Sequence, residues 1–324
     1  MIYQWAIKVL FFAASLSVSS EVFAVAGSDS SAEQRSVSRM QVVTTFSILA
    51  DLVQQIGGDY ITVNTLVDWD EDAHVYHPTP SDVRHLAKAE LLVLNGLGFE
   101  GWLERLISAS KFKGQLVTAA HGINVITLNV GETHAEHHGH AEHHEHGQQG
   151  VDPHAWHSLS AVKIYIQNIT AALSQLDRQH QSYYQSNAAQ YLVELDRLEK
   201  DTREKLSSLN DLQRNIVMPH NAFAYLARDY NLHVYSLKGV NSESEASAAQ
   251  IAQVIRKIKA KNIRAVFTET TADDRLINLV KQETGALMGG ALISGALSKK
   301  LAPTYLDMMR YNIDRLTQAL VYSE

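Results

Sequence analysis

The chain has 324 residues, of which 45% are hydrophobic and 19% are charged, so a sizeable buried core and about two domains are expected. Its 28 Lys and Arg residues against 35 Asp and Glu residues give a net charge of −7, which argues against nucleic acid and anionic membrane surfaces as partners. It contains no cysteine, which excludes disulfides and thiolate metal ligands, and we therefore expect no cysteine-linked lipid anchor.

Residues 1–24 are expected to form a cleaved secretory signal peptide. Lys8 precedes an apolar stretch from Val9 to Val18, and small residues around Ala24 suit cleavage. A membrane anchor is the alternative, but the stretch is only about half as long as a span needs to be. The polar, Ser-rich residues 25–40 are expected to be an unstructured leader. We therefore predict a periplasmic protein that carries no lipid.

Strand and helix patterns alternate from about residue 41 onward. The chain order predicts strands at 41–45, 61–67 and 91–94, a helical stripe from Ile48 to Ile56, and a helix at 158–176. Residues 182–209 contain no Gly or Pro and repeat apolar residues at four–three spacing, which predicts one long helix. The second alternation predicts strands at 215–218, 233–237, 265–268 and 287–291, with helices near 222–230, 246–260 and 273–284.

This alternation predicts an α/β fold of two lobes with parallel sheets. The expected limits are 41–179 for the N-terminal lobe, 180–210 for a connecting helix and 211–324 for the C-terminal lobe. The cleft between the lobes is the natural place for a ligand.

A histidine-rich tract interrupts the first lobe with the sequence GETHAEHHGHAEHHEHGQQG at residues 131–150. It lacks apolar anchors, so residues 132–150 are expected to form a mobile loop without the rigid geometry of a high-affinity site. We interpret it as an accessory that holds additional weak metal ions, gathers metal or accepts it from a periplasmic metal carrier; a flexible insert with incidental affinity is the alternative. Its histidines are His134, His137, His138, His140, His143, His144 and His146.

Three histidines outside the tract occupy corresponding places in the pattern. His74 and His220 each follow a predicted strand and precede a helix, where ligands of open α/β sheets bind, and His154 follows the tract. The helix after His74 is marked by Thr79 as N-cap and Pro80 at the first position. Three neutral imidazoles suit Zn²⁺ and leave a fourth position for a carboxylate or water. Each histidine taken alone could equally be a helix cap or a core residue.

Several segments together resemble the metal-binding substrate-binding proteins of bacterial ABC transporters, of the zinc/manganese type. They are HVYHPTPSDVRHLAKAELLVLNGLGFE, DPHAW, HNAFAYLARDYNL, VFTETTADDRLINLVKQETGA and TYLDMMRYNIDRL, and the likeness runs from about Val42 to Leu320. The resemblance implies Rossmann-like lobes joined by a long rigid helix, with one metal ion held between them by His74, His154 and His220. Manganese-selective members often carry Glu at the third position, so the histidine there and the His-rich loop resemble the zinc branch.

The resemblance breaks at one position of the implied site. Many relatives carry an aspartate ligand in a segment resembling LYSDALS, whereas this chain reads LISGALS and has Gly295 at that place. A carboxylate beside the first histidine is also absent, because Ala73 stands there. Water, Asp72 or Glu269, or a histidine of the tract could supply the fourth ligand. Glu269 could instead accept a hydrogen bond from a ligand imidazole, while Asp72 and Asp152 are expected to form turns. His77, His85, His157 and His233 are expected to be structural or exposed, and His157 would lie one turn from His154 if that segment is helical.

The resemblance implies a monomeric zinc receptor that delivers Zn²⁺ to an ABC permease and its ATPase, and not an enzyme. Two alternatives are left open. A periplasmic zinc buffer would rely on the tract alone and would not depend on His74 or His220. A zinc hydrolase could use a zinc-bound water, but the sequence has no HExxH, GxSxG or paired acid/base motif.

Overall fold

The computed structural model describes residues 39–128, 150–242, 245–271 and 273–321. These residues belong to one compact unit that spans residues 38–324. The expected signal peptide and the histidine tract lie outside the described residues, so the expectations for their structure stay predictions. No described helix is long and apolar enough to cross a membrane.

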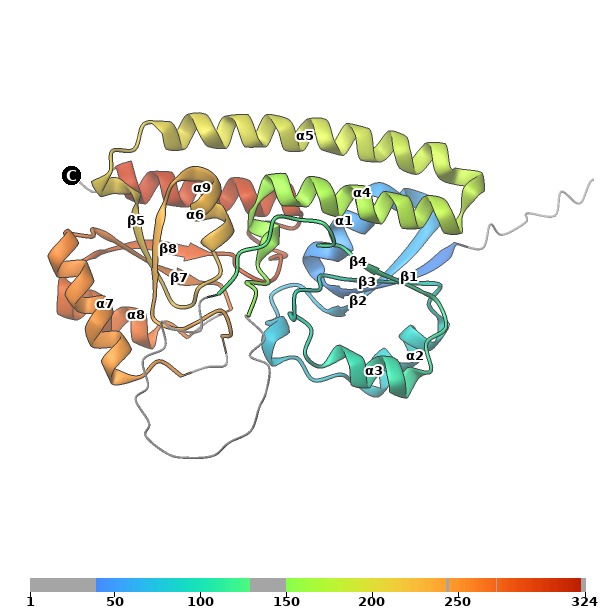
Figure 1. Cartoon of the computed structure of the whole chain (residues 1–324), viewed down its shortest axis with the longest axis horizontal. Coiled ribbons are helices and arrows are strands. Elements are labelled where there is room, and N and C mark those ends of the chain that lie inside the picture. Colours follow the sequence, from blue (N-terminus) through green and yellow to red (C-terminus); the bar gives the residue numbers. More distant parts are fainter. Residues whose placement is uncertain (1–38, 129–149, 243–244, 272, 322–324) are drawn as a thin grey trace, which may run out of the picture. The chain divides into compact units, whose positions relative to one another are not determined.

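Two four-stranded parallel sheets confirm the predicted α/β fold with two lobes (Figure 1). The first sheet has the order β2-β1-β3-β4 and the second β6-β5-β7-β8. The first contains β1 (Met40–Phe46), β2 (Ile61–Val67), β3 (Leu91–Leu94) and β4 (Gln115–Thr118), and the second contains β5 (Asn215–Met218), β6 (His233–Ser236), β7 (Ala265–Glu269) and β8 (Leu287–Leu292).

Helices cover both faces of each sheet (Figure 1). In the N-terminal lobe, α1 (Ser47–Gly57) and α4 (Leu159–Leu176) lie on one side and α2 (Pro80–Lys88) and α3 (Leu103–Ser110) on the other. In the C-terminal lobe, α6 (Ala224–Tyr230) and α9 (Tyr305–Val321) lie opposite α7 (Ala248–Lys261) and α8 (Arg275–Thr284). Because both faces are covered, central strands such as β3, with the sequence LLVL, are continuous apolar runs.

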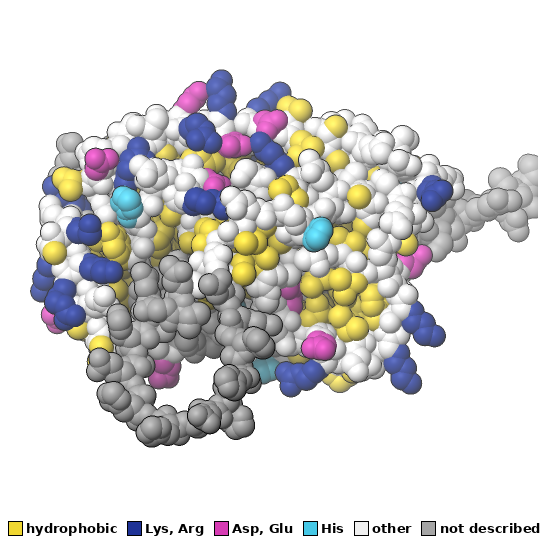
Figure 2. Space-filling view, in the orientation of Figure 1, with side chains coloured by type: hydrophobic (Ala, Val, Ile, Leu, Met, Phe, Trp, Pro, Cys, Tyr) yellow, Lys and Arg dark blue, Asp and Glu magenta, His cyan; other side chains and the backbone are white. Residues whose placement is uncertain are grey.

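The long helix α5 (Gln181–Ser207) connects the lobes and packs against α1, α4 and α9. The predicted stripe is buried, including Tyr184, Tyr191 and Leu195. The opposite side is charged and carries ion pairs one turn apart, such as Arg197–Glu194 at 2.7 Å. Figure 2 shows basic and acidic side chains interspersed along this edge of the molecule. The apolar stripe therefore fixes which side of α5 faces the lobes.

Buried contacts join the two lobes directly. One hydrophobic cluster contains residues of both sheets, for example Val42 of β1 and Phe267 of β7. Trp156 Nε1 donates to the Ser294 carbonyl oxygen at 2.8 Å, and the Tyr305 hydroxyl donates to the Trp156 carbonyl oxygen at 2.7 Å. Since a shared core resists separation, the lobes are expected to move little relative to each other.

Candidate metal centre

His74, His154 and His220 meet between the lobes. Each offers one ring nitrogen, and these three atoms all lie within 4.8 Å of one another. The Nε2 atoms of His74 and His154 are 3.2 Å apart. Two nitrogens bound tetrahedrally to one Zn²⁺ at about 2.0–2.1 Å would be separated by roughly 3.3 Å. The three imidazoles therefore need only small adjustments to bind a single ion.

His74 lies in the short 3-10 turn Ala73–Val75 that follows β2. Its backbone N–H donates to Asp72 Oδ1 at 2.9 Å, which is the turn expected from the sequence. The Trp102 indole donates to the Ala73 carbonyl oxygen at 3.0 Å, and Phe99 contacts the imidazole edge-on with ring centroids 5.0 Å apart. Both hydrogen bonds hold the peptide group between Ala73 and His74, and so help to orient this histidine.

His154 precedes the 3-10 turn Ala155–His157 and is 1% exposed. Asp152 Oδ1 accepts both the backbone N–H of His154, at 2.9 Å, and its Nδ1–H, at 2.8 Å. Asp152 therefore does more than form the expected turn, because a carboxylate on Nδ1 leaves the Nε2 lone pair for a metal. Asn95 Nδ2 and the Tyr225 hydroxyl donate to the carbonyl oxygens of Pro153 and Asp152, which fixes this segment on both lobes.

His220 lies just beyond β5, and Glu269 forms the last residue of the neighbouring strand β7. Both Glu269 oxygens lie 2.7–2.8 Å from His220 Nδ1, and Oε1 also accepts the His220 backbone N–H at 3.2 Å. The Ser294 hydroxyl donates to Glu269 Oε2 at 2.6 Å. Glu269 thus makes the contact with the His220 imidazole that the sequence allowed for it, and again Nε2 is the ring nitrogen that could bind a metal.

Burial shifts the pKa of two groups at the site, His154 and Asp152. Burial, helped by the two neighbouring imidazoles, lowers the pKa of His154 well below its usual range, so this ring is neutral at physiological pH. Burial also raises the pKa of Asp152 to about 6. A neutral imidazole is the form that binds a divalent metal, so no proton has to leave His154 on capture.

The other residues singled out in the sequence take different places. Asp72 and Glu269 bond to the histidines and do not belong to the group of three converging ligand atoms. His157 is buried and donates from Nε2 to the Ser294 carbonyl oxygen at 2.8 Å, as a structural residue would. Gly295 follows Ser294, and a Cβ atom added there would meet nothing within 4 Å. Of the histidines singled out in the sequence, His77, His85 and His233 are exposed.

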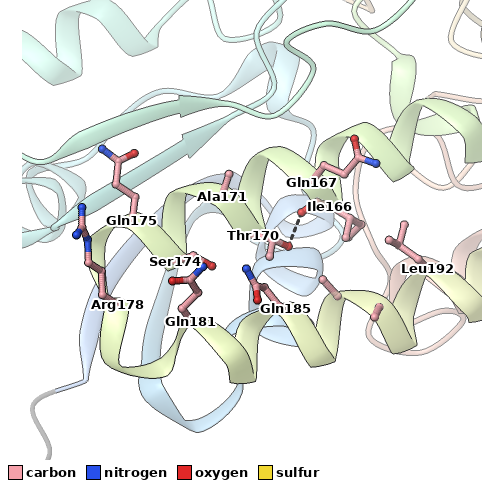
Figure 3. A pocket seen from close by; sticks show the side chains of 12 residues that line it. Ile166, Gln167, Thr170, Ala171, Ser174, Gln175, Arg178, Gln181, Gln185 and Leu192 are labelled. Atoms are coloured by element: carbon pink, nitrogen blue, oxygen red, sulfur yellow. Dashed lines mark hydrogen bonds between the residues drawn. The ribbon is translucent and has the colours of Figure 1, made fainter.

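A pocket of about 320 Å³ opens onto His74, and its lining includes Phe99, Trp102, Val240 and Asn241. A larger groove of about 640 Å³ lies between α4 and α5, with glutamine side chains of both helices along it (Figure 3). None of the three converging histidines lines that groove. The smaller pocket is therefore the one that leads to the candidate metal centre.

The family model of the zinc-uptake complex component A, periplasmic (ZnuA) matches residues 42–319. The chain belongs to this family. It is 33% identical to the iron-binding protein YfeA of Yersinia pestis over 283 residues, which cover 86% of each chain. It is 30% identical to the manganese-binding lipoprotein MntA of Halalkalibacterium halodurans, over 87% of this chain and 88% of that protein.

Solved structures agree with the fold. The Mn-bound and Cd-bound forms of the periplasmic metal binding protein from Candidatus Liberibacter asiaticus each match with a TM-score of 0.76 and 28% identity, over 87% of this chain and 100% of theirs. The chain is thus a metal-binding, exported substrate-binding protein of the ABC transporter type, and the prediction of a receptor rather than an enzyme is confirmed. The relatives include proteins named for iron and for manganese, so membership of the family leaves the metal open.

Proposed function

We propose that this chain is a periplasmic zinc receptor, which captures one Zn²⁺ ion with His74, His154 and His220 and delivers it to an ABC permease and its ATPase. The observation that carries the proposal is the convergence of three imidazole nitrogens, with no carboxylate in the converging group of the described residues. Imidazole donors suit Zn, Cu and Ni, whereas Mn prefers carboxylate, carbonyl and water ligands. The choice of zinc rests on this donor set.

The proposed mechanism is capture and release. Asp152 and Glu269 hold two imidazoles with Nε2 facing the ion, so little reorganisation is needed when the metal arrives. The pocket beside His74 is the route by which the ion reaches them. Docking on the permease would then separate the ligands by moving the short segments that carry them, since two of them lie on segments of one lobe and His220 on a segment of the other.

We propose water as the fourth ligand. Both oxygens of Asp72 and both of Glu269 are already hydrogen-bonded, and Gly295 has no side chain to contribute. A zinc ion on three histidines with one open position commonly binds water. The seven histidines of the tract stay an alternative source of this ligand.

The tract at 132–150 is proposed to gather zinc near the cleft or to receive it from a periplasmic metal carrier. The residues on either side of it are joined: Leu128 N donates to the Gly150 carbonyl oxygen at 2.7 Å, and Val151 lines the pocket that opens onto His74. Val151, which directly follows the tract, therefore lies beside the route to the site. If deletion of 132–147 changed neither zinc loading nor growth under zinc starvation, the gathering role would be wrong.

We further propose that residues 1–24 are removed during export and that the mature receptor is a monomer without a lipid. The proposed lobe limits are 41–179 and 211–324, with 180–210 as the connecting segment. These proposals are supported by the sequence patterns alone. Mass spectrometry of the mature protein purified from the periplasm tests the removal of residues 1–24 and the absence of a lipid directly.

A competitive zinc titration tests the function. The native mature chain should bind one ion tightly, and so should a variant that lacks 132–147, whereas His220→Ala should lose tight binding. His233→Ala, an exposed histidine of the same lobe, is the matched control and should bind as the native chain does. A parallel titration with Mn²⁺ should give weaker binding.

Two results would overturn the proposal. Tighter binding of Mn²⁺ than of Zn²⁺ would refute the choice of metal. Loss of all tight zinc binding on deletion of 132–147, with His220→Ala unchanged, would instead favour a zinc buffer that works through the tract.

A further inference from the structure

The loop of residues 238–242, which follows β6, is bonded to the segment that carries His220. Lys238 N donates to the Pro219 carbonyl oxygen and Asn221 N donates to the Gly239 carbonyl oxygen, both at 3.0 Å. Pro219 and Asn221 are the two neighbours of His220 in the chain. The loop and this ligand are therefore expected to move together.

The same loop reaches across to the other lobe. The Ser242 hydroxyl donates to Asp72 Oδ2 at 2.9 Å, while Asp72 Oδ1 accepts the backbone N–H of His74 at the same distance. Lys238 Nζ donates to the Ser242 carbonyl oxygen at 3.0 Å and so holds the end of the loop in place. One chain of hydrogen bonds thus runs from the His220 segment through Ser242 and Asp72 to His74.

This chain joins two ligands that belong to different lobes. Val240 and Asn241, on the same loop, line the pocket through which His74 is reached. A hydrogen bond to a carboxylate is stronger than one between neutral groups, so Ser242–Asp72 is suited to hold the loop against the turn of His74. Breaking it would free the loop and the His74 turn to separate, and that separation opens the site.

We infer that Ser242 is a positioning residue that, through Asp72, fixes His74 relative to His220 and slows release of the bound metal. The inference rests on the proposed metal site and adds to it a cross-lobe restraint on the rate of release. Contact of the loop with a docked permease would remove the restraint at the moment of delivery.

The experiment measures zinc release from the loaded protein into excess chelator by stopped flow. Ser242→Ala should release zinc about tenfold faster, the amount expected from losing one hydrogen bond to a charged acceptor. Ser242→Thr keeps the hydroxyl and should release zinc close to the native rate. The absorption spectrum of bound Co²⁺ should change in Ser242→Ala and not in Ser242→Thr, because it reports the geometry of the ligands.

Lys299→Ala is the matched control. Lys299 Nζ bonds Asp68 Oδ2 at 3.1 Å, so it joins the C-terminal lobe to the turn that contains Asp72 without touching Asp72 itself. A purely mechanical link between lobes would make both alanine variants release faster. The positioning role predicts acceleration in Ser242→Ala alone, and no further acceleration when Ser242→Ala is added to Asp72→Ala.

The inference is refuted if Ser242→Ala releases zinc at the native rate, or if Lys299→Ala accelerates release as much. Failure of the proposed function would look different, because the native chain itself would then bind no metal ion tightly. Urea unfolding of the metal-free variants completes the test: equal midpoints exclude a general loss of stability as the cause of faster release.

Discussion

Glu269→Gln separates the charge of this residue from its shape. Glu269 is 3% exposed, accepts hydrogen bonds from His220 and accepts one from the Ser294 hydroxyl. The amide oxygen of glutamine can still accept from His220, and its NH₂ group can donate to Ser294, so no buried group is left without a partner. The substitution removes only the negative charge beside His220 Nδ1. That charge makes the imidazole a stronger metal ligand.

We expect Glu269→Gln to weaken zinc binding by about 10–100-fold, the usual effect of altering a partner of a ligating histidine. This corresponds to about 1.4–2.7 kcal/mol. The stability of the metal-free protein should change much less. The substitution removes the cost of burying the negative charge together with the electrostatic attraction that this charge provides, and the two largely offset each other. Competitive zinc titration and urea unfolding without metal measure the two quantities separately.

Two further variants sharpen this test. Glu283→Gln makes the same change on an exposed carboxylate of α8 and should leave zinc affinity unaltered. Glu269→Ala leaves the His220 donors and the Ser294 hydroxyl unpaired and should destabilise even the metal-free protein, at about 1–3 kcal/mol for each buried group. An affinity of Glu269→Gln within twofold of the native value would refute the role of the charge.

Three other variants or conditions test separate parts of the structure. Gly295→Asp should tighten zinc binding about tenfold, or 1.4 kcal/mol, because an added Cβ meets nothing within 4 Å and the aspartate supplies an anionic ligand; an unchanged titration would mean that position 295 does not face the ion. Burial lowers the pKa of His157 from 6.5 to about 3, so below about pH 6.5 the unfolded chain binds more protons than the native one. The free energy of unfolding of the native chain, relative to that of His157→Gln, should therefore fall by about 1.4 kcal/mol per pH unit between pH 6 and pH 4. Urea unfolding of the two metal-free proteins measures this difference, and a difference that stays constant with pH would refute the reasoning. Ser247→Ala removes the capping box that Ser247 and Gln250 form at the start of α7 and should cost about 1 kcal/mol in urea unfolding, with zinc affinity unchanged.

Much of the fold was predictable because its determinants are local. Strands buried on both faces appear as apolar runs, and the stripe of α5 follows the helical period. The N-cap at Thr79 was also predicted, and with Asp82 it forms a capping box at the start of α2. The sequence did not reveal β4, whose four residues QLVT are mostly half-exposed and give neither a long run nor an alternation.

The meeting of His74, His154 and His220 was expected from the sequence, but not all of the residues that bond to them. His74 and His220 could be found from their places after strands, where a parallel sheet gathers side chains at one edge. The contact of Asp152 with the His154 ring was missed, because a turn residue two positions before a histidine need not bond its side chain. Ser242 was also missed, since it meets Asp72 across 170 positions of sequence and no local pattern encodes that pairing.

The buried bonds between the lobes have a consequence for transport. A receptor whose lobes share one core cannot signal its loading by swinging shut, so the empty and the loaded forms should offer the permease nearly the same docking face. Empty receptors would then compete with loaded ones, and uptake would depend on their ratio rather than on the total amount of receptor. Adding excess metal-free protein to transporter vesicles should therefore slow zinc uptake, and an unchanged rate would show that the permease distinguishes the two forms.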